Sequence, residues 1–113
     1  MQEDVKRYKA LGDAQRLRAL AFIAHATECC VCEVQEVLGL TAPTASRAVR
    51  MLEDIGWLQS RRNGKWVYYS LAELQDDETR LRELVLRKVA GQEQVQFDRA
   101  RYEELEQIPI CTP

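Results

Sequence analysis

The sequence predicts a mainly α-helical fold that carries one small β-hairpin. Apolar residues recur at helical spacing in several segments of the 113-residue chain, most clearly over residues 41–56. Directly after that segment, two short runs rich in valine, tyrosine and tryptophan flank Asn63-Gly64. Asn-Gly in this position is a strong hairpin signal, because a two-residue type I′ turn needs positive φ at both positions. We therefore expect the hairpin to turn at Asn63-Gly64.

Residues 41–56 predict the best-defined helix of the chain. Thr41 is a good N-cap, Pro43 fits the first turn, where a missing N–H does no harm, and Gly56 follows the last periodic residue. One apolar stripe runs along this helix through Ala45, Ala48, Val49, Leu52 and Ile55. The stripe should face the core and leave the opposite side of the helix to solvent.

The exposed side of this helix carries hydroxyl and guanidinium groups. A helix whose first turns present such groups can enter the major groove of DNA and contact bases and phosphates. The residues expected to contact DNA from this helix are Thr41, Pro43, Thr44, Ser46, Arg47 and Arg50. Taken alone, the pattern also fits an ordinary amphipathic surface helix.

Basic residues gather around the tip of the hairpin. Arg61, Arg62 and Lys65 surround Asn63-Gly64. A basic hairpin directly behind a candidate recognition helix is the pattern of a winged helix–turn–helix, in which the helix reads the groove and the wing contacts phosphate. Residues 41–70 hold five basic and two acidic side chains, a local charge of +3 in a chain whose net charge is −2. This segregation favours a DNA-facing surface, and the alternative is an exposed hairpin whose charges only aid solubility.

Two helices are expected ahead of the helix–turn–helix. A short one covers residues 3–11, and a second runs over about residues 14–26 with Asp13 as its cap. Arg16 and Arg18 are expected on the outer side of the second helix.

The first half of a helix–turn–helix follows. Val31, Val34 and Leu38 share a helical stripe, and Gly39-Leu40 then leads to the Thr41 cap. Helix, tight turn and helix in this order make the motif complete.

The segment behind the hairpin predicts terminal helices. Asp76-Asp77-Glu78 places negative charge at a helix start, where the helix dipole favours it, and Glu78 and Arg82 are spaced to pair on the exposed side. Gly91 should end or bend this helix, which then resumes. We expect one domain over residues 1–106 and an irregular C-terminal tail over 107–113. Apolar stripes on the terminal helices that a small core cannot cover suggest a homodimer that is formed through these helices.

Composition excludes several classes of protein. No apolar run approaches membrane-spanning length and the N-terminus has no signal-peptide pattern, so a cytoplasmic protein without a membrane partner is expected. No nucleophile–base pair or phosphate loop is present, and His25 is the only histidine, so an enzyme is the weakest interpretation. No organic cofactor is expected. Four cysteines in a reducing compartment are ligands, sensors or core residues more often than disulfides.

Three of those cysteines, Cys29, Cys30 and Cys32, lie within four residues. Thiolates select soft, thiophilic ions. On an ideal helix Cys29 and Cys32 are neighbours, whereas Cys30 and Cys32 point nearly opposite ways. Three sulfurs could then meet one ion only if the first turn unwinds, which would distort the helix that supports the recognition helix. Two alternatives stay open: cysteines that fill the core, and a thiol redox switch in which Cys32 or Cys111 forms the disulfide.

At this point the sequence resembles the ArsR/SmtB family of metal-sensing repressors. The segment Glu28-Cys29-Cys30-Val31-Cys32-Glu33 is similar to the family's Glu-Leu-Cys-Val-Cys-Asp motif, and Tyr8 to Arg18 is similar to its first helix junction. Ser46-Arg47 and the run from Gly64 to Tyr69 match its recognition helix and wing. The resemblance covers residues 5 to about 90. It implies a homodimeric winged-helix repressor that leaves its double-stranded operator when a metal or metalloid binds.

Within the family, Cys30 and Cys32 fall on the pair that marks the branch responding to trivalent arsenic and antimony. Cadmium and lead sensors are the next nearest alternative. The third cysteine of that branch is replaced here by Gln35. We expect Cys29 to supply the third thiolate because it is adjacent, whereas Cys111 would close a loop of about 80 residues at an entropic cost that grows with length. Residues 76–106 contain no histidine, so the family's zinc-type site on the C-terminal helix is not expected.

Overall fold

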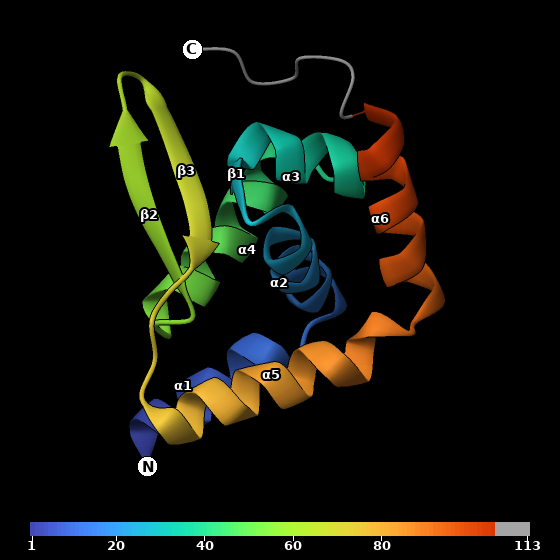
Figure 1. Ribbon diagram of the computed structural model, residues 1–113. Coiled ribbons are helices and arrows are strands. Elements are labelled where there is room, and N and C mark those ends of the chain that lie inside the picture. The colour runs from blue at the N-terminus through green and yellow to red at the C-terminus, as the bar shows by residue number, and fades with distance from the viewer. Residues whose placement is uncertain (106–113) are drawn as a thin grey trace.

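The structure is a computed structural model in which residues 1–105 are described (Figure 1). These residues form six helices and a three-stranded antiparallel sheet, which lies at one side of the molecule. The elements are α1 (Gln2–Leu11), α2 (Ala14–Ala26), β1 (Glu28–Cys30), α3 (Val31–Leu38), α4 (Ala42–Asp54), β2 (Leu58–Asn63), β3 (Trp66–Leu71), α5 (Asp76–Ala90) and α6 (Glu93–Leu105). The predicted fold class is confirmed. The predicted irregular tail, with Cys111, lies outside the described residues.

The core forms around α2, which runs through the middle of the molecule in Figure 1. Side chains of α2, α3 and α4 meet there with residues from the base of the hairpin. The largest fully buried side chains include Trp57, Phe22, Leu20, Ile23 and Leu52. Three of the five stripe residues of the recognition helix, Ala45, Val49 and Leu52, are fully shielded from solvent. The predicted stripe is therefore the face that seats α4 on the core.

Two predicted caps are confirmed. The Asp13 side chain accepts hydrogen bonds from the backbone N–H groups of Gln15 and Arg16, which fixes the start of α2. The Thr41 side chain accepts from the Thr44 N–H and begins α4. Between them, Gly39 ends α3 in the left-handed conformation with φ of 68°, which glycine adopts without steric cost.

The sheet has the strand order β1–β3–β2, and β1 was not predicted. The expectation of a helical turn through Cys29 and Cys30 is wrong: Glu28–Cys30 is extended, and α3 begins at Val31 with Cys30 as its N-cap. β1 pairs with β3 through Cys29 opposite Tyr69 and Cys30 opposite Tyr68. This pairing joins segments that are far apart in sequence, so the local periodicity of the sequence does not predict it.

The hairpin turns one residue later than predicted. Asn63 still pairs with Trp66 at the end of the ladder, so Gly64 and Lys65 form the two-residue loop. Gly64 has a φ of 64°, whereas Lys65 does not have positive φ. A positive φ at the first loop position alone fits a type II′ turn and not the expected type I′. Asn63 is instead a strand residue.

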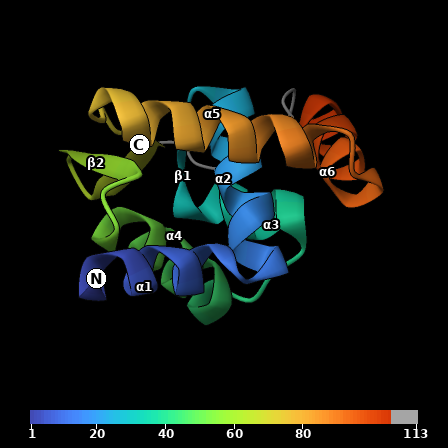
Figure 2. The same cartoon turned by 90° about the horizontal axis from the view of Figure 1, so that it is seen from below.

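Helices α1 and α5 border one side of the molecule, which Figure 2 views directly. The carboxylate of Glu78 on α5 pairs with Arg7 of α1 and accepts a 3.0 Å hydrogen bond from the buried Trp57 Nε1. Arg82 is buried and donates to the carbonyls of Trp57 and Ala72. The expected surface pair of Glu78 with Arg82 is therefore wrong. Both side chains instead form hydrogen bonds to residues at the base of the hairpin. No helix within residues 1–105 is long and apolar enough to cross a membrane.

Candidate DNA-binding surface and thiol site

The outer face of α4 presents polar and basic side chains to solvent. Thr41, Pro43, Arg47 and Arg50 are exposed, and Thr44 and Ser46 are half-buried. Pro43, Ser46, Arg47 and Arg50 line one open hollow with Met51 and Asp54. Four of the six residues predicted to contact DNA from this helix thus line one open hollow, and Thr44 lines a neighbouring hollow with Arg47.

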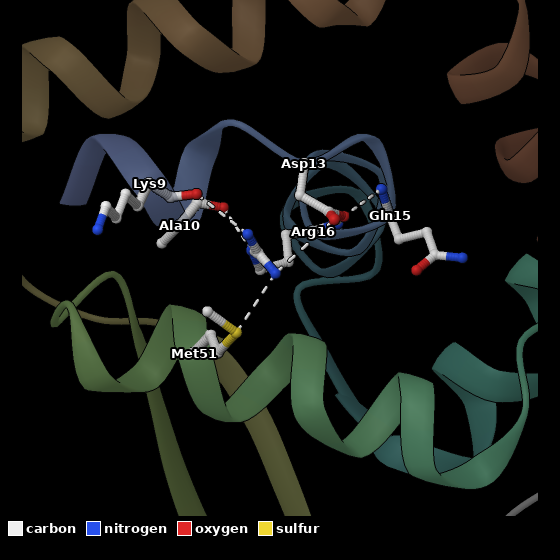
Figure 3. Close-up of polar contacts among 6 residues, drawn as sticks. All are labelled: Lys9, Ala10, Asp13, Gln15, Arg16 and Met51. Carbon is white, nitrogen blue, oxygen red and sulfur yellow. Dashed lines mark hydrogen bonds and ion pairs between the residues drawn. The ribbon is translucent and has the colours of Figure 1, made fainter. Parts of the chain in front are cut away.

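Arg16 holds the recognition helix in place, as Figure 3 shows. Its Nε and Nη2 donate to the backbone carbonyls of Ala10 and Lys9 at the end of α1, at 2.5 and 3.0 Å. Its Nη1 lies 3.3 Å from Met51 Sδ on α4, a weak acceptor. The expectation that Arg16 points outward is wrong, because the end of α1 offers carbonyls that only a long cationic donor can reach. One side chain therefore links α1, α2 and α4.

The wing carries the other predicted basic residues, in two different settings. Arg62 and Lys65 are exposed at and near the tip, and the Lys65 ammonium lies 5.7 Å from the centre of the Trp66 ring. Arg61 is instead engaged by the protein itself. Its Nε and Nη2 donate to the two oxygens of Glu28 at 2.6 and 2.7 Å, and its guanidinium lies over the Tyr68 ring. The hydrogen bond from Arg61 holds the pKa of the Glu28 carboxyl below its usual value.

The thiol site lies where β1 passes into α3. The sulfurs of Cys30 and Cys32 are 2.7 Å apart. The expectation that these side chains diverge is wrong, because Cys30 is an extended N-cap residue with φ of −90° and ψ of 165° and does not belong to the helix. The Glu33 carboxylate accepts from the Cys30 N–H at 3.1 Å and lies 3.6 Å from its sulfur. The two sulfurs can therefore contact one thiophilic ion together.

Cys29 lies apart from this pair. Its side chain is 1% exposed and belongs to the hydrophobic core. Neighbouring residues of a strand point to opposite faces of the sheet, so Cys29 and Cys30 point away from each other. The helical proximity of Cys29 to Cys32 that motivated its choice as third ligand is absent. Burial, and then the charges of Glu33 and Glu28, raise the pKa of the Cys29 thiol well above its usual range.

Within residues 1–105, no group of three histidine, cysteine, aspartate or glutamate side chains is arranged to hold a metal ion. The sulfurs brought together within these residues are those of Cys30 and Cys32, and Cys111 lies outside the described residues. Sequence reasoning missed the role of Glu33, although its position three residues after the helix cap is the spacing of a capping box. The bond between Glu28 and Arg61 left no local signal, because 33 residues separate the partners.

A helix–turn–helix with an exposed polar recognition face, followed by a basic hairpin, defines a winged helix–turn–helix DNA-binding domain. A solved structure with this description is similar to the chain: the homodimeric winged helix–turn–helix domain Mb0332 from Mycobacterium bovis, a possible ArsR-family transcriptional regulator. The identity is 31%, the TM-score is 0.65, and the match covers 79% of each chain. No protein-family model matches the chain.

Two curated relatives point the same way. Over 64 residues, 57% of this chain, it is 44% identical to the arsenic resistance transcriptional regulator ArsR1 of Pseudomonas putida, of which the match covers 50%. Over 90 residues it is 33% identical to the cadmium resistance transcriptional regulatory protein CadC homolog of Staphylococcus aureus, covering 80% of this chain and 70% of that protein. The chain belongs to the ArsR family of transcriptional regulators. These relatives are regulators and not enzymes, as expected from the sequence.

Proposed function

We propose that the chain is a transcriptional repressor that binds operator DNA and is released when trivalent arsenic or antimony binds at Cys30 and Cys32. The observation that carries this proposal is the 2.7 Å separation of the two sulfurs at the start of α3. The relative ArsR1 of Pseudomonas putida, named for arsenic resistance, supports the choice of ion. The chain spans about half the length of that relative, so this assignment is a proposal for the whole protein.

The DNA contacts proposed for the repressor come from two elements. Thr41, Pro43, Thr44, Ser46, Arg47 and Arg50 of α4 enter the major groove. Arg62 and Lys65 of the wing contact phosphate. Arg61 can contact phosphate only with the part of its guanidinium that Glu28 does not engage. A cytoplasmic protein with this local positive charge can reach DNA despite its net charge of −2.

A homodimer is part of the proposal. Twofold-related half-sites need two recognition helices. Val5 and Tyr8 of α1 and Leu84 of α5 are large apolar side chains left exposed on the side that these helices border. The Mycobacterium bovis neighbour, described as homodimeric, supports this assembly. Covering these apolar side chains in a dimer would stabilise both subunits.

Ligand release is proposed to act through α3. Cys30 caps this helix, and its core face, which carries Val34, Val37 and Leu38, packs in the same cluster as Ala45 and Val49 of α4. An ion bound by Cys30 and Cys32 replaces the cap interactions at the start of α3. A shift of α3 then moves the recognition helix, because a close-packed core transmits displacement.

The proposed site needs a third ligand. Trivalent arsenic is expected to bind three thiolates, so the pair leaves one position. Recruiting Cys29 requires β1 to separate from β3 and a buried thiol to ionise against a raised pKa. This cost weighs against the expectation that Cys29 supplies the third thiolate. The proposed ligands are therefore Cys30 and Cys32, with Cys29 and Cys111 as alternatives for the third thiolate.

A thiol redox switch is the second candidate function, and the same sulfur separation favours it. A peroxide could oxidise Cys30 and Cys32 to a disulfide: the two thiols lose two protons and two electrons, and the peroxide is reduced to two waters or to water and an alcohol. A cadmium or lead response is the alternative within the family, supported by the CadC homolog.

One titration separates these candidates. The reduced protein is mixed with fluorescent duplexes that it selects from a random library. It is then titrated with arsenite, antimonite, cadmium, lead, zinc and hydrogen peroxide while the anisotropy of the DNA is followed. We expect release by arsenite and antimonite at the lowest concentrations. Release only by cadmium or lead, or only by peroxide in a form that dithiothreitol reverses, would replace the proposal with the corresponding alternative.

A further inference from the structure

An ion pair joins the two outer strands of the sheet across the strand between them. Glu28 is on β1 and Arg61 is on β2, and β3 separates these strands. The guanidinium donates to both carboxylate oxygens, at 2.6 and 2.7 Å, and its carbon lies 4.8 Å from the centre of the Tyr68 ring on β3. Such a paired and stacked arginine is fixed in orientation as well as position. The wing is thereby tied to the strand that carries the first thiol.

The strand register places this pair beside the thiol site. Tyr68 lies opposite Cys30 on one side and opposite Arg61 on the other. Residues directly opposite each other in an antiparallel sheet project from the same face, and so do residues two apart in one strand. Glu28, Cys30, Tyr68 and Arg61 therefore share one face of the sheet. Tyr68 is thus the one residue that separates Cys30 from Arg61 across the sheet.

The segment that carries Cys30 has little freedom to absorb a displacement. β1 is three residues long and leads directly into the N-cap of α3. Thr27, the residue before it, has φ of 74° and ψ of −52°. A β-branched residue rarely adopts positive φ, and such a conformation persists only where the surroundings hold it. A pull on Cys30 is thus passed along β1 to Glu28.

We propose that Glu28 is a positioning residue that couples ligand binding at Cys30 and Cys32 to the orientation of the wing. This inference rests on the proposed function and adds to it a second route to the DNA besides α3. In the ligand-free protein the bond to Arg61 sets the angle of the hairpin at which Arg62 and Lys65 reach phosphate. When an ion binds between the two sulfurs, which lie 2.7 Å apart without it, Cys30 is displaced, β1 shifts, and Glu28 carries Arg61 and the wing with it.

The test compares Glu28→Gln with Glu36→Gln. Both changes remove one carboxylate that pairs with an arginine, but Glu36 is on α3 and its partner Arg101 is on α6, away from the wing. Exposed ion pairs add little stability, so both variants should fold. For each variant, operator affinity is measured with and without saturating arsenite, and arsenite affinity is measured separately in the absence of DNA. We expect Glu28→Gln to bind arsenite within about twofold of the unmodified protein. The factor by which arsenite weakens operator binding should be about threefold smaller in Glu28→Gln, a change of the size that an exposed ion pair can supply. Glu36→Gln should behave as the unmodified protein.

A double-mutant cycle shows whether Glu28 acts through Arg61. Arg61→Gln and the double variant Glu28→Gln/Arg61→Gln are measured in the same way. If the pair transmits the signal, the double variant should lose no more of the arsenite response than either single variant. Additive losses would overturn the proposed route through Arg61.

Other outcomes separate this inference from the proposed function. A full arsenite response in Glu28→Gln would overturn the coupling role and leave the arsenite repressor intact. Weakened arsenite binding by Glu28→Gln would place the carboxylate in the ligand site and also overturn the coupling role. Failure of arsenite to release the unmodified protein would overturn the proposed function, and the inference with it.

Discussion

Arg18 and Asp98 form a buried ion pair between α2 and α6, 80 residues apart in sequence. The Nε and Nη2 atoms of Arg18 donate to the two carboxylate oxygens of Asp98 at 2.9 and 2.8 Å, and Nη2 also donates to the Leu38 carbonyl at the end of α3. Asp98 is 2% exposed. The expectation that Arg18 lies on the outer side of α2 is wrong, because Asp98 of α6 pairs with it. The pair joins the last described helix to the turn of the helix–turn–helix.

Asp98→Ala should destabilise the fold strongly, since it leaves the Arg18 guanidinium half-buried without its carboxylate. The expected loss in free energy of unfolding is about 3 kcal/mol, at the lower end for broken buried pairs because Arg18 keeps some contact with solvent. Urea denaturation followed by circular dichroism measures it. The exposed Glu104→Ala on the same helix should change the value by less than about 0.5 kcal/mol. Equal effects of the two changes would contradict this account of the pair.

Arg47→Ala and Arg50→Ala should weaken operator binding without changing the fold. Both side chains are exposed on the recognition helix, so their removal opens no cavity. If either arginine reads a base, the loss should be about 1–3 kcal/mol and should relax specificity at that position. Binding to selected and to random duplexes, measured at a fixed salt concentration, gives both quantities. Arg80→Ala on α5 is the control, and a loss in that variant as large as in the other two would remove α4 as the reading helix.

Cys30→Ser and Cys32→Ser should each retain operator binding but lose release by arsenite. Cys30 and Cys32 lie at the start of α3 and not on the outer face of α4, so under the proposed function their replacement should remove the response to the ion and leave the DNA contact in place. The same anisotropy titration checks both variants. A Cys30→Ser protein that arsenite still releases at normal concentrations would exclude the pair as the ligand site.

The buried Cys29 thiol should make the fold sensitive to alkaline pH. Its pKa is raised above that of the unfolded chain, which is about 8.5. The folded state therefore keeps a proton that the unfolded state gives up. The stability this contributes is complete below about pH 8.5 and is lost as the pH rises toward the folded pKa, by up to about 1.4 kcal/mol per pH unit.

Reduced protein is unfolded with urea between pH 7 and pH 9.5 to measure this loss. In Cys29→Ala the alkaline slope should be smaller by the contribution of one group. The same variant should keep the arsenite response if Cys29 only packs in the core, and should lose a sulfur ligand if it closes the site. Identical pH slopes in the two proteins would contradict the burial of this thiol.

Tyr8→Glu should weaken self-association. Tyr8 is 59% exposed on α1 next to the exposed Val5, and a carboxylate there would be desolvated in an interface. Light scattering at micromolar concentration should give a dimer for the unmodified protein and a larger monomer fraction for Tyr8→Glu. Phe97→Glu, which changes an equally exposed aromatic residue on α6, is the matched control. Dissociation by Phe97→Glu alone would move the interface to α6.

Local signals predicted the helices well. The Asp13 and Thr41 caps, the apolar stripe of α4 and the glycine at the end of α3 each depend on neighbours within a few residues, and each lies where the sequence placed it. The exposed polar side chains of α4 follow from the same periodicity.

The hairpin turn and the contacts of Arg16 with Lys9 and Ala10 were local errors, but the larger errors involve long-range partners. β1 exists because Cys29 and Cys30 pair with β3, which is about 40 residues away along the chain. Arg18 and Arg61 are held by carboxylates 80 and 33 residues away. The convergence of Cys30 and Cys32 follows from the strand, because only an extended residue at the cap turns its sulfur toward the second position of the helix. A pattern confined to one element does not contain these contacts.

The strand order also leaves β2 at an edge of the sheet, where a strand of another molecule could pair with it. β2 is an edge strand, and its outer residues from Gln59 to Asn63 are all exposed. An edge with unpaired backbone groups invites another strand to add to it, and positive charge discourages that addition. Arg62 on this edge therefore discourages aggregation, whereas the charge of Arg61 is engaged by Glu28 on β1. Variants that remove charge from the wing should therefore replace arginine with glutamine and not with valine or isoleucine. A β-branched apolar residue on this edge would favour fibrous assembly, which would obscure any loss of DNA binding.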